Sequence, residues 1–374
     1  MADSIVIAAG GTGGHIYPGV AIAQALKQLH PNLEIHFVGS EGGMESRVIP
    51  PLGFPLHKLP VGPLHSSSGL KKRLSTLFRL PKVALQTWRV LRVLKPKFLL
   101  GVGGYASGPA LFVGHFMGYR TFIWEPNAMP GWTNRILSRF VDEAFVVFEE
   151  ARKYLKCKKV TAMGMPLRPQ IENAPPKSFS SVQSQNSQDS KFHVFVFGGS
   201  QGAKSINDCL SELLTAPSWR NRLAGFEFVH QTGQRDFDRM QSLYEQHKSS
   251  LAAPVQVLEY VSDMEAKYQW ADLVISRSGT GTLSELAALG VPSVLVPYPF
   301  AADNHQQKNA EALVERGAAR MILNADLNPA SLLSILEDFR SHSETLAKLA
   351  KAALGFHKKG AAHELAQTLW ERIS

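Results

Sequence analysis

The sequence predicts an α/β protein built from two doubly wound, Rossmann-like domains. Short apolar runs alternate with stretches of helical spacing along the chain, which is typical of parallel sheets with crossover helices. A strand followed at once by a glycine-rich loop occurs twice, at Ile5–Gly14 and at Phe192–Gly202. The 374 residues, 44% of them hydrophobic, suffice for two domains of this kind.

The first domain opens with Ile5-Val6-Ile7, an apolar run without alternation that is typical of a buried parallel strand. Glycines at positions 10, 11, 13 and 14 then permit a tight turn, and Val20–Leu29 has helical spacing. The unpaired amides at the start of such a helix favour an anion, usually a phosphate. A plain tight turn between strand and helix is the alternative interpretation.

Two well-known phosphate-binding patterns are absent from these loops. The dinucleotide pattern G-x-G-x-x-G fails because Ile16 stands at its last position. The Walker pattern fails because Ala203 separates Gly202 from Lys204 and Ser205. The sequence therefore supports neither a dehydrogenase nor a P-loop NTPase.

The remaining elements follow in two series, separated by a polar stretch at Glu172–Lys191 that we interpret as a linker or loop. We expect domains at 1–165 and 166–345, and a helical tail at 346–374 that docks on one of them, with the N-terminal domain as the candidate. Ligands are expected in a cleft at the carboxyl ends of the strands. The expected strands are Ile5–Ala9, Ile35–Gly39, Phe98–Gly103, Arg120–Trp124, Ala144–Phe148, Val160–Met163, Phe192–Phe197, Glu227–Gln231, Val255–Glu259, Leu273–Ser276, Ser293–Val296 and Ala319–Leu323.

Composition restricts the setting of the protein. Two distant cysteines, Cys157 and Cys209, provide no disulfide framework, which fits a reducing compartment. The N-terminus has no basic and apolar leader, so we expect no signal peptide. Phe98–Tyr119 holds 22 residues without a charge, but its Gly-Gly and Gly-Pro pairs favour a strand, a loop and a short helix over a membrane span.

The positive charge is concentrated in one region. Ser46–Trp124 contains twelve Lys or Arg and no acidic residue, which leaves 28 basic and 31 acidic residues elsewhere. Within it, Leu70–Lys97 mixes nine basic residues with Leu, Phe, Val and Trp88, a pattern typical of a surface for anionic lipid. A solvated helix is the alternative. No nucleic-acid-binding motif accompanies the charge, so we expect no nucleic-acid partner.

Three polar segments carry candidate chemistry. His15 stands at the start of the first helix, whose N-terminus disfavours the imidazolium and so suits a general base, although a packing histidine is the alternative. Arg277–Glu285 is a second strand-to-helix loop suited to a diphosphate, with Glu285 suited to ribose hydroxyls, or else a capping arrangement. Asp303–Gln307 suits sugar hydroxyls. No metal-ligand spacing or catalytic serine elbow is present, so we expect neither a bound metal nor acyl chemistry.

Five motifs in order carry a family resemblance: GGTGGHIYPG from Gly10, GVGGYASGP from Gly101, GGSQGA from Gly198, RSGTGTLSEL from Arg277 and DNHQQKNA from Asp303. With them, nearly the whole chain resembles the MurG family of GT-B glycosyltransferases, which are peptidoglycan N-acetylglucosaminyltransferases. The resemblance implies two Rossmann-like domains facing across a deep cleft. It also implies transfer of N-acetylglucosamine, without a cofactor or metal, from UDP-GlcNAc to the 4-hydroxyl of undecaprenyl-pyrophosphoryl-MurNAc-pentapeptide (lipid I).

The resemblance also implies a location and a set of site residues. The enzyme would lie on the cytoplasmic face of the bacterial membrane as a peripheral protein, with Leu70–Lys97 on anionic phospholipid. His15 would be the base, and the loop of Gly103, Gly104, Tyr105 and Ser107 would face the acceptor. The implied substrate-binding residues are Thr12, Gly13, Gly14, Asn127, Arg168, Ser200, Val261, Thr280, Gly281, Thr282, Glu285, Gln306 and Gln307.

The chain departs from the family pattern at two places. Trp124-Glu125-Pro126-Asn127 replaces the usual His-Glu-Gln-Asn, and Gly164-Met165-Pro166 replaces the usual Gly-Asn-Pro. Both affect acceptor-side detail and leave the donor motifs intact. Transfer to another lipid, a UDP-sugar 2-epimerase, and a non-catalytic sensor or membrane scaffold are the alternatives. An epimerase would have no use for the basic apolar face, and a non-catalytic protein would not need His15 and Glu285.

Overall fold

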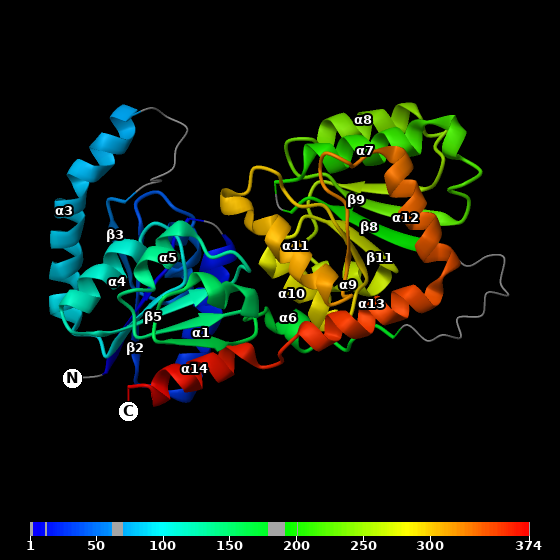
Figure 1. The fold of residues 1–374 in the computed structure, drawn as a ribbon. Helices are drawn as coiled ribbons and strands as arrows, with labels where there is room; N and C mark the ends of the chain where they lie inside the picture. The colour runs from blue at the N-terminus through cyan, green and yellow to red at the C-terminus, as the bar shows by residue number, and fades with distance from the viewer. Residues whose placement is uncertain (1–2, 12, 62–69, 179–190, 200, 374) are drawn as a thin grey trace. The chain divides into compact units, whose positions relative to one another are not determined.

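The computed structural model describes residues 3–11, 13–61, 70–178, 191–199 and 201–373, with the backbone alone at 70–79. The chain forms two compact units, one of Met1–Arg168 with Lys358–Ser374 and one of Pro169–His357 (Figure 1). Each unit contains one parallel sheet covered by helices, which confirms the predicted doubly wound α/β architecture.

The described strands of the N-terminal unit form a parallel sheet in the order β3-β2-β1-β4-β5-β6-β7. Because β1 lies between β2 and β4, the chain order reverses beside it, and ligands of such sheets bind outside that point. All six expected strands are present. The strands are β1 (Ser4–Ala8), β2 (Glu34–Ser40), β3 (Leu56–Leu59), β4 (Phe98–Gly101), β5 (Arg120–Glu125), β6 (Glu143–Val146) and β7 (Lys159–Ala162).

The sequence analysis missed β3. Its residues, Leu-His-Lys-Leu, form a short edge strand in which Leu59 alone is fully buried. An edge strand that is largely solvent-accessible needs no continuous apolar run, so the signal used for the buried strands is missing here.

Helices cover both faces of the first sheet. α1 begins at Gly13, well before the apolar spacing becomes clear, and this places His15 in its first turn. Phe98–Tyr119 forms β4, a loop and α4, as predicted, and no helix within the described ranges is long and apolar enough to cross a membrane. The helices are α1 (Gly13–Leu29), α2 (Glu45–Val48), α3 (Leu70–Leu94), α4 (Ser107–Phe116), α5 (Trp132–Leu137) and α14 (Ala361–Glu371), with 3-10 turns at Pro50–Leu52 and Glu149–Tyr154.

The last helix, α14, returns to the N-terminal unit and packs against α1 (Figure 1). The His30 ring stacks on the Trp370 indole with centroids 3.8 Å apart. Arg372 Nε donates a 2.9 Å hydrogen bond to the buried Glu143 carboxylate. An aromatic stack and a charged hydrogen bond therefore hold the end of the chain against the first sheet.

The C-terminal unit repeats the plan with the strand order β10-β9-β8-β11-β12-β13, again all parallel. α7, α8 and α12 lie on one face of the sheet, and α9 and α10 on the other (Figure 1). The six strands expected here are confirmed: β8 (Phe192–Phe197), β9 (Phe226–Gln231), β10 (Val255–Leu258), β11 (Leu273–Ser276), β12 (Ser293–Leu295) and β13 (Arg320–Met321).

The C-terminal unit is completed by its helices and by the start of the polar stretch Glu172–Lys191. Within the stretch interpreted as a linker, Lys177 Nζ donates to the carbonyl oxygens of Gln269 (2.9 Å) and Ala271 (2.6 Å), while 179–190 lie outside the described residues. The start of that stretch is therefore attached to this unit. The helices are α6 (Pro169–Glu172), α7 (Lys204–Thr215), α8 (Phe237–Gln246), α9 (Met264–Trp270), α10 (Thr280–Leu289), α11 (His305–Glu315), α12 (Pro329–Ser341) and α13 (Ser343–Phe356), with 3-10 turns at Pro217–Trp219 and Ala302–Asn304.

Candidate functional site

The two glycine loops of the N-terminal unit pack on each other. One follows β1 and the other follows β4, and these strands are hydrogen-bonded neighbours. Gly104 lies so close to Gly10 that a Cβ at Gly104 would stand 2.0 Å from the Gly10 carbonyl oxygen. Its φ of +84° also belongs to the left-handed region that favours glycine. The glycine at 104 is therefore required both by its conformation and by its contact.

His15 lies against the second of these loops. A Cβ at Gly103 would stand 2.5 Å from His15 Cδ2 and 2.8 Å from its Nε2, and the φ of Gly103 is +106°. The fold thus brings the candidate base beside the candidate acceptor loop, although the two are far apart in the sequence. Gly13 and Gly14 form the first turn of α1 beside His15, and Thr12 lies outside the described residues.

In the candidate acceptor loop, Ser107 lies inside the fold and Tyr105 lies at the surface. Ser107 is fully buried, and its hydroxyl lies 2.8 Å from the carbonyl oxygens of both Ala8 and Gly103. It also accepts a 3.2 Å hydrogen bond from the Gly103 N–H. Ser107 therefore ties the loop to β1, while Tyr105 is 41% exposed and available to a ligand.

Asn127 belongs to a network around Glu125, a buried carboxylate whose role the sequence analysis missed. Glu125 accepts hydrogen bonds from Asn127 N (2.9 Å) and Nδ2 (3.0 Å), Gly131 N (3.2 Å) and Asn134 Nδ2 (2.9 Å). Burial raises the pKa of Glu125, and these four bonds oppose the shift. The Asn127 amide is therefore held in place by Glu125. Trp124, one of the departures from the family pattern, is fully buried in β5.

The C-terminal unit contains a cavity of about 1010 Å³ at the carboxyl ends of its strands. Its wall includes Gly198, Gln201 and Gly202 of the third glycine loop, which follows β8. The start of α7, Arg277, the Tyr298–Phe300 turn and Gln306 also line the cavity. Sheets of this type bind ligands at this edge. Ser200 of the third loop lies outside the described residues.

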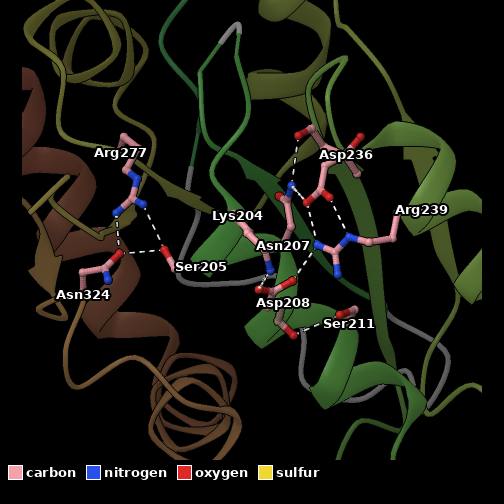
Figure 2. Close-up of polar contacts among 10 residues, drawn as sticks. Lys204, Ser205, Asn207, Asp208, Ser211, Asp236, Arg239, Arg277 and Asn324 are labelled. Atoms are coloured by element: carbon pink, nitrogen blue, oxygen red, sulfur yellow. Dashed lines mark hydrogen bonds and ion pairs between the residues drawn. The ribbon is translucent and has the colours of Figure 1, made fainter. Parts of the chain in front are cut away.

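Arg277 supplies a cation to this cavity, and within the described part of the chain its hydrogen-bond acceptors are all neutral. Its Nη1 donates to the carbonyl oxygens of Val296 and Pro297 and to Asn324 Oδ1 (2.9 Å), and its Nη2 donates to Ser205 Oγ (2.9 Å; Figure 2). All these acceptors are neutral, and burial lowers the pKa of Arg277 to about 10. A partly buried guanidinium whose described hydrogen-bond acceptors are neutral favours an anionic ligand.

On the opposite wall, ion pairs hold α7 and α8 together. Arg239 Nε donates to Asp236 (2.6 Å), and its Nη2 donates to Asp208 (2.5 Å; Figure 2). The hydrogen bond from Arg239 lowers the pKa of Asp236 below its ordinary value. Lys204 also pairs with Asp208 at 2.5 Å. The sequence analysis did not find this set, because its members come from two helices and their spacing matches no motif.

Behind these ion pairs lies a buried histidine. Asn207 Nδ2 donates to Thr232 O (3.0 Å) and Asp236 Oδ2 (2.7 Å), so its Oδ1 is left to accept from His230 Nε2 at 3.0 Å. His230 Nδ1 then accepts from the Tyr244 hydroxyl at 3.0 Å. Burial lowers the pKa of His230 to about 3, so the ring is neutral in this tautomer at ordinary pH.

The loop before α10 is held by α11. Asn309, which is fully buried, donates from Nδ2 to Ser278 O (3.3 Å) and Thr280 Oγ1 (3.2 Å), and Ser278 Oγ donates to Gln306 O (2.8 Å). Thr280, Gly281 and Thr282 form the first turn of α10. The first amides of a helix have no partner within the helix and favour an anion at its N-terminus. Asn309 lies within the quoted DNHQQKNA motif, but its contacts could not be read from spacing.

Glu285 is oriented by a tyrosine. The hydroxyl of the fully buried Tyr268 donates to Glu285 Oε2 at 3.0 Å, and Glu285 is itself partly exposed one turn into α10. Val261, one of the implied substrate-binding residues, is buried in the segment after β10. Arg168 is exposed at the end of the N-terminal unit.

The two glutamines at the start of α11, Gln306 and Gln307, have different surroundings. Gln306 lines the cavity, and its Oε1 accepts from Tyr298 N at 3.0 Å. Gln307 instead bonds to Asn304 (2.8 Å) and Glu311 (2.9 Å). Asp303 and Asn304 both have positive φ, +52° and +56°, which is uncommon outside glycine and occurs at functional sites. Among the described residues, the cavity wall does not include Val261, Thr280, Gly281, Thr282, Glu285 or Gln307.

Two Rossmann-like units with glycine loops at their switch points define the chain as a protein of the GT-B glycosyltransferase fold. Residues 5–146 match the glycosyltransferase family 28 N-terminal domain, and 193–365 match the family 28 C-terminal domain. The chain belongs to the MurG family, the UDP-N-acetylglucosamine--N-acetylmuramyl-(pentapeptide) pyrophosphoryl-undecaprenol N-acetylglucosamine transferases. This confirms the resemblance found in the sequence.

Three similar proteins support this assignment. The transferase of that name from Bdellovibrio bacteriovorus is 46% identical over 355 residues, which cover 95% of each chain. The crystal structure of Acinetobacter baumannii MurG matches with a TM-score of 0.78 at 26% identity over 99% of each chain. The UDP-GlcNAc 2-epimerase of Neisseria meningitidis, bound to UDP-GlcNAc, matches with a TM-score of 0.66 at 15% identity over 99% of this chain and 100% of that one, which shows the fold alone.

Proposed function

We propose that the protein transfers N-acetylglucosamine from UDP-GlcNAc to the 4-hydroxyl of the MurNAc residue in lipid I, with inversion at the anomeric carbon. The observation that carries this proposal is the 46% identity, over 95% of both chains, to the Bdellovibrio bacteriovorus transferase. A match of this extent includes residues of both units.

On the donor side, the proposed roles follow from charge. Bond cleavage at the anomeric carbon leaves UDP with developing negative charge on the diphosphate. The N-terminal amides of α10 and the Arg277 guanidinium are positive groups fixed in the same unit, and fixed positive groups stabilise such charge without reorganisation. Glu285, oriented by Tyr268, would accept the ribose hydroxyls, and Gln306 would meet the sugar.

On the acceptor side, His15 would act as the general base. The acceptor hydroxyl attacks the anomeric carbon while its proton passes to the His15 imidazole, and the bond from that carbon to the UDP oxygen breaks. The contact between His15 and Gly103 supports this role, because it places the ring at the loop proposed to hold the acceptor. Gly104 and Tyr105 belong to the same loop, and Ser107 would act by fixing its shape.

We also place the protein at the cytoplasmic face of the membrane as a peripheral enzyme, with Leu70–Lys97 on anionic phospholipid. The described part of α3 supports this, because the apolar Leu85, Trp88 and Val93 are exposed (Val93 by 81%). The basic Arg89 and Arg92, close to them in the sequence, are exposed as well. On α4, which packs against α3, Phe112 and Phe116 are exposed as well. Apolar side chains interleaved with cations are suited to the boundary between headgroups and acyl chains.

The test uses purified protein, radiolabelled UDP-GlcNAc and liposomes that carry lipid I, with and without anionic phospholipid. We expect label in the lipid phase, equimolar release of UDP, and faster transfer on the anionic liposomes. Conversion of UDP-GlcNAc to its 2-epimer without labelled lipid would identify an epimerase. Bound UDP-GlcNAc with neither product would contradict the transferase proposal, and equal rates on both liposomes would contradict the membrane surface.

A further inference from the structure

Glu45 is a buried carboxylate beside the first glycine loop, with a role that no motif indicates. It lies at the start of α2 and is 0% exposed. Its Oε1 accepts hydrogen bonds from Ser40 N and Ser40 Oγ, both at 2.6 Å, and its Oε2 accepts one from Gly11 N at 3.3 Å. All three partners are donors, so the site is suited to an acceptor with two oxygens.

Three glycines make room for this carboxylate. A Cβ at Gly43 would stand 2.1 Å from a Glu45 oxygen, a Cβ at Gly39 would stand 2.6 Å from its Cγ, and one at Gly10 would stand 3.1 Å from Oε1. The surrounding chain is therefore shaped around the acidic group. A buried carboxylate is costly unless it is hydrogen-bonded, and here the bonds come from β2 and from the glycine loop.

The same loop contacts the proposed acceptor loop on its other side. Gly104 packs on the Gly10 carbonyl, and Gly103 packs on the His15 ring. Gly11 donates its N–H to Glu45, and α1 begins two residues later, at Gly13. His15 lies in the first turn of α1. The loop thus stands between Glu45 on one side and Gly103–Gly104 on the other. A shift of Gly11 would therefore move the start of α1 relative to the second loop.

We infer that Glu45 is a positioning residue, which holds Gly10 and Gly11 in place and through them sets the position of His15 against Gly103. The inference deepens the proposed function and rests on it for the role of His15. Reacting groups displaced by about 1 Å can cost up to about 100-fold in rate, so one hydrogen bond to the loop can matter for turnover.

The test compares E45Q with S40A. Glutamine has nearly the same volume but a single acceptor oxygen, so it can satisfy either Ser40 or Gly11 and places an N–H₂ donor against the other. Alanine at 40 removes the hydroxyl bond and leaves the bond between Glu45 and Gly11. We expect kcat to fall about tenfold or more in E45Q, with the KM for UDP-GlcNAc within about twofold, and S40A to keep kcat within about twofold. A merely structural role would lower the melting temperature of both variants and spare kcat in both.

Hydrogen–deuterium exchange provides a readout that needs no turnover. The peptide covering residues 8–15 should exchange faster in E45Q than in S40A or the unmodified protein. Unchanged exchange together with kcat within about twofold in E45Q would overturn the inference. If no protein, modified or not, transfers label to lipid, the proposed function fails while the exchange result still decides whether Glu45 holds the loop.

A second variant covers the case in which E45Q is too unstable to purify. E45D keeps the charge but draws the carboxylate back by one methylene, away from Gly11. The same loss of kcat and the same faster exchange at residues 8–15 are expected in E45D. Full activity with unchanged exchange in E45D would overturn the inference as well.

Discussion

The imidazole of His15 packs directly on the backbone of Gly103, with no room for a side chain between them. A Cβ on Gly103 would come within 2.5 Å of His15 Cδ2. The two residues follow different strands, β1 and β4, which are neighbours in the sheet. The position of the candidate base is therefore set by a loop that the sequence places far away.

This contact makes G103A a specific test of the site. The added methyl group displaces the His15 ring, and the φ of +106° is unfavourable for alanine, so we expect kcat for transfer to fall about tenfold or more. The matched control is G108A, whose Cβ would meet nothing closer than Thr133 Cγ2 at 3.5 Å. Steady-state kinetics of both variants provide the test. Equal kcat values in G103A and G108A would show that the position of the His15 ring is unimportant.

Replacing His15 itself tests its role as the base. We expect H15A to lower turnover by about 10²–10⁴-fold, the usual contribution of general base catalysis, with UDP-GlcNAc affinity nearly unchanged. Turnover is measured with labelled donor, and affinity by titration calorimetry. An H15A enzyme with full turnover would remove His15 from the base role.

The hydrogen bond from Tyr268 to Glu285 predicts an effect on donor binding. Y268F removes one hydroxyl and leaves Glu285 less firmly oriented, so we expect the KM for UDP-GlcNAc to rise about threefold to tenfold with kcat retained. Y244F serves as the control, because the Tyr244 hydroxyl bonds to His230 and the residue is also buried within the same unit. An unchanged KM in Y268F would contradict the assignment of Glu285 to the ribose.

Arg277 predicts a loss of donor affinity through charge. Hydrogen bonds to charged groups contribute about 1.5–3 kcal/mol, so R277Q should weaken UDP-GlcNAc binding about tenfold or more. R222Q is the control, because it removes an arginine of the same unit that pairs with Glu337 at the surface. If both variants bind the donor as tightly as the unmodified protein, the cavity beside Arg277 does not hold the diphosphate.

His230 predicts an acid-sensitive C-terminal unit. Its pKa of about 3 in the folded protein lies below the unfolded value of 6.5, so the unfolded chain binds the proton more readily. The stability contributed by the neutral ring is complete above pH 6.5 and is lost as the pH falls toward 3. Between pH 7 and pH 5 the loss is about 2 kcal/mol, which corresponds to roughly 5 °C in melting temperature.

The variant H230Q has no titrating ring at this position, and glutamine offers both a donor and an acceptor to Asn207 and Tyr244. Its melting temperature should fall less between pH 7 and pH 5 than that of the unmodified protein. Thermal unfolding followed by circular dichroism at the two pH values provides the comparison. An equal fall in melting temperature in H230Q and in the unmodified protein would assign the acid sensitivity to other groups.

Much of the fold could be predicted because a buried parallel strand is recognisable from a few consecutive apolar residues. Val194 and Val196 in β8, or Ile5 and Ile7 in β1, form apolar runs that need no partner to be recognised. The edge strand β3 was not predicted, because its pairing with β2 depends on main-chain hydrogen bonds, which are independent of the side-chain pattern. The roles of Glu45 and Glu125 were missed for a related reason, since their partners are backbone amides, a serine hydroxyl and asparagine side chains that the folded loops turn toward the carboxylates.

The sequence by itself determined the two parallel α/β units, the five motifs and, through them, membership of the family. These features are local, since strand burial, glycine at a turn and the start of a helix each depend on a few consecutive residues. The tertiary structure alone decided that His15 rests on Gly103, that Glu45 holds Gly11, and that Arg277 meets neutral acceptors. Each of these contacts joins segments that follow different strands, and the strand order of the sheet, which brings them together, is set by the packing of the whole unit.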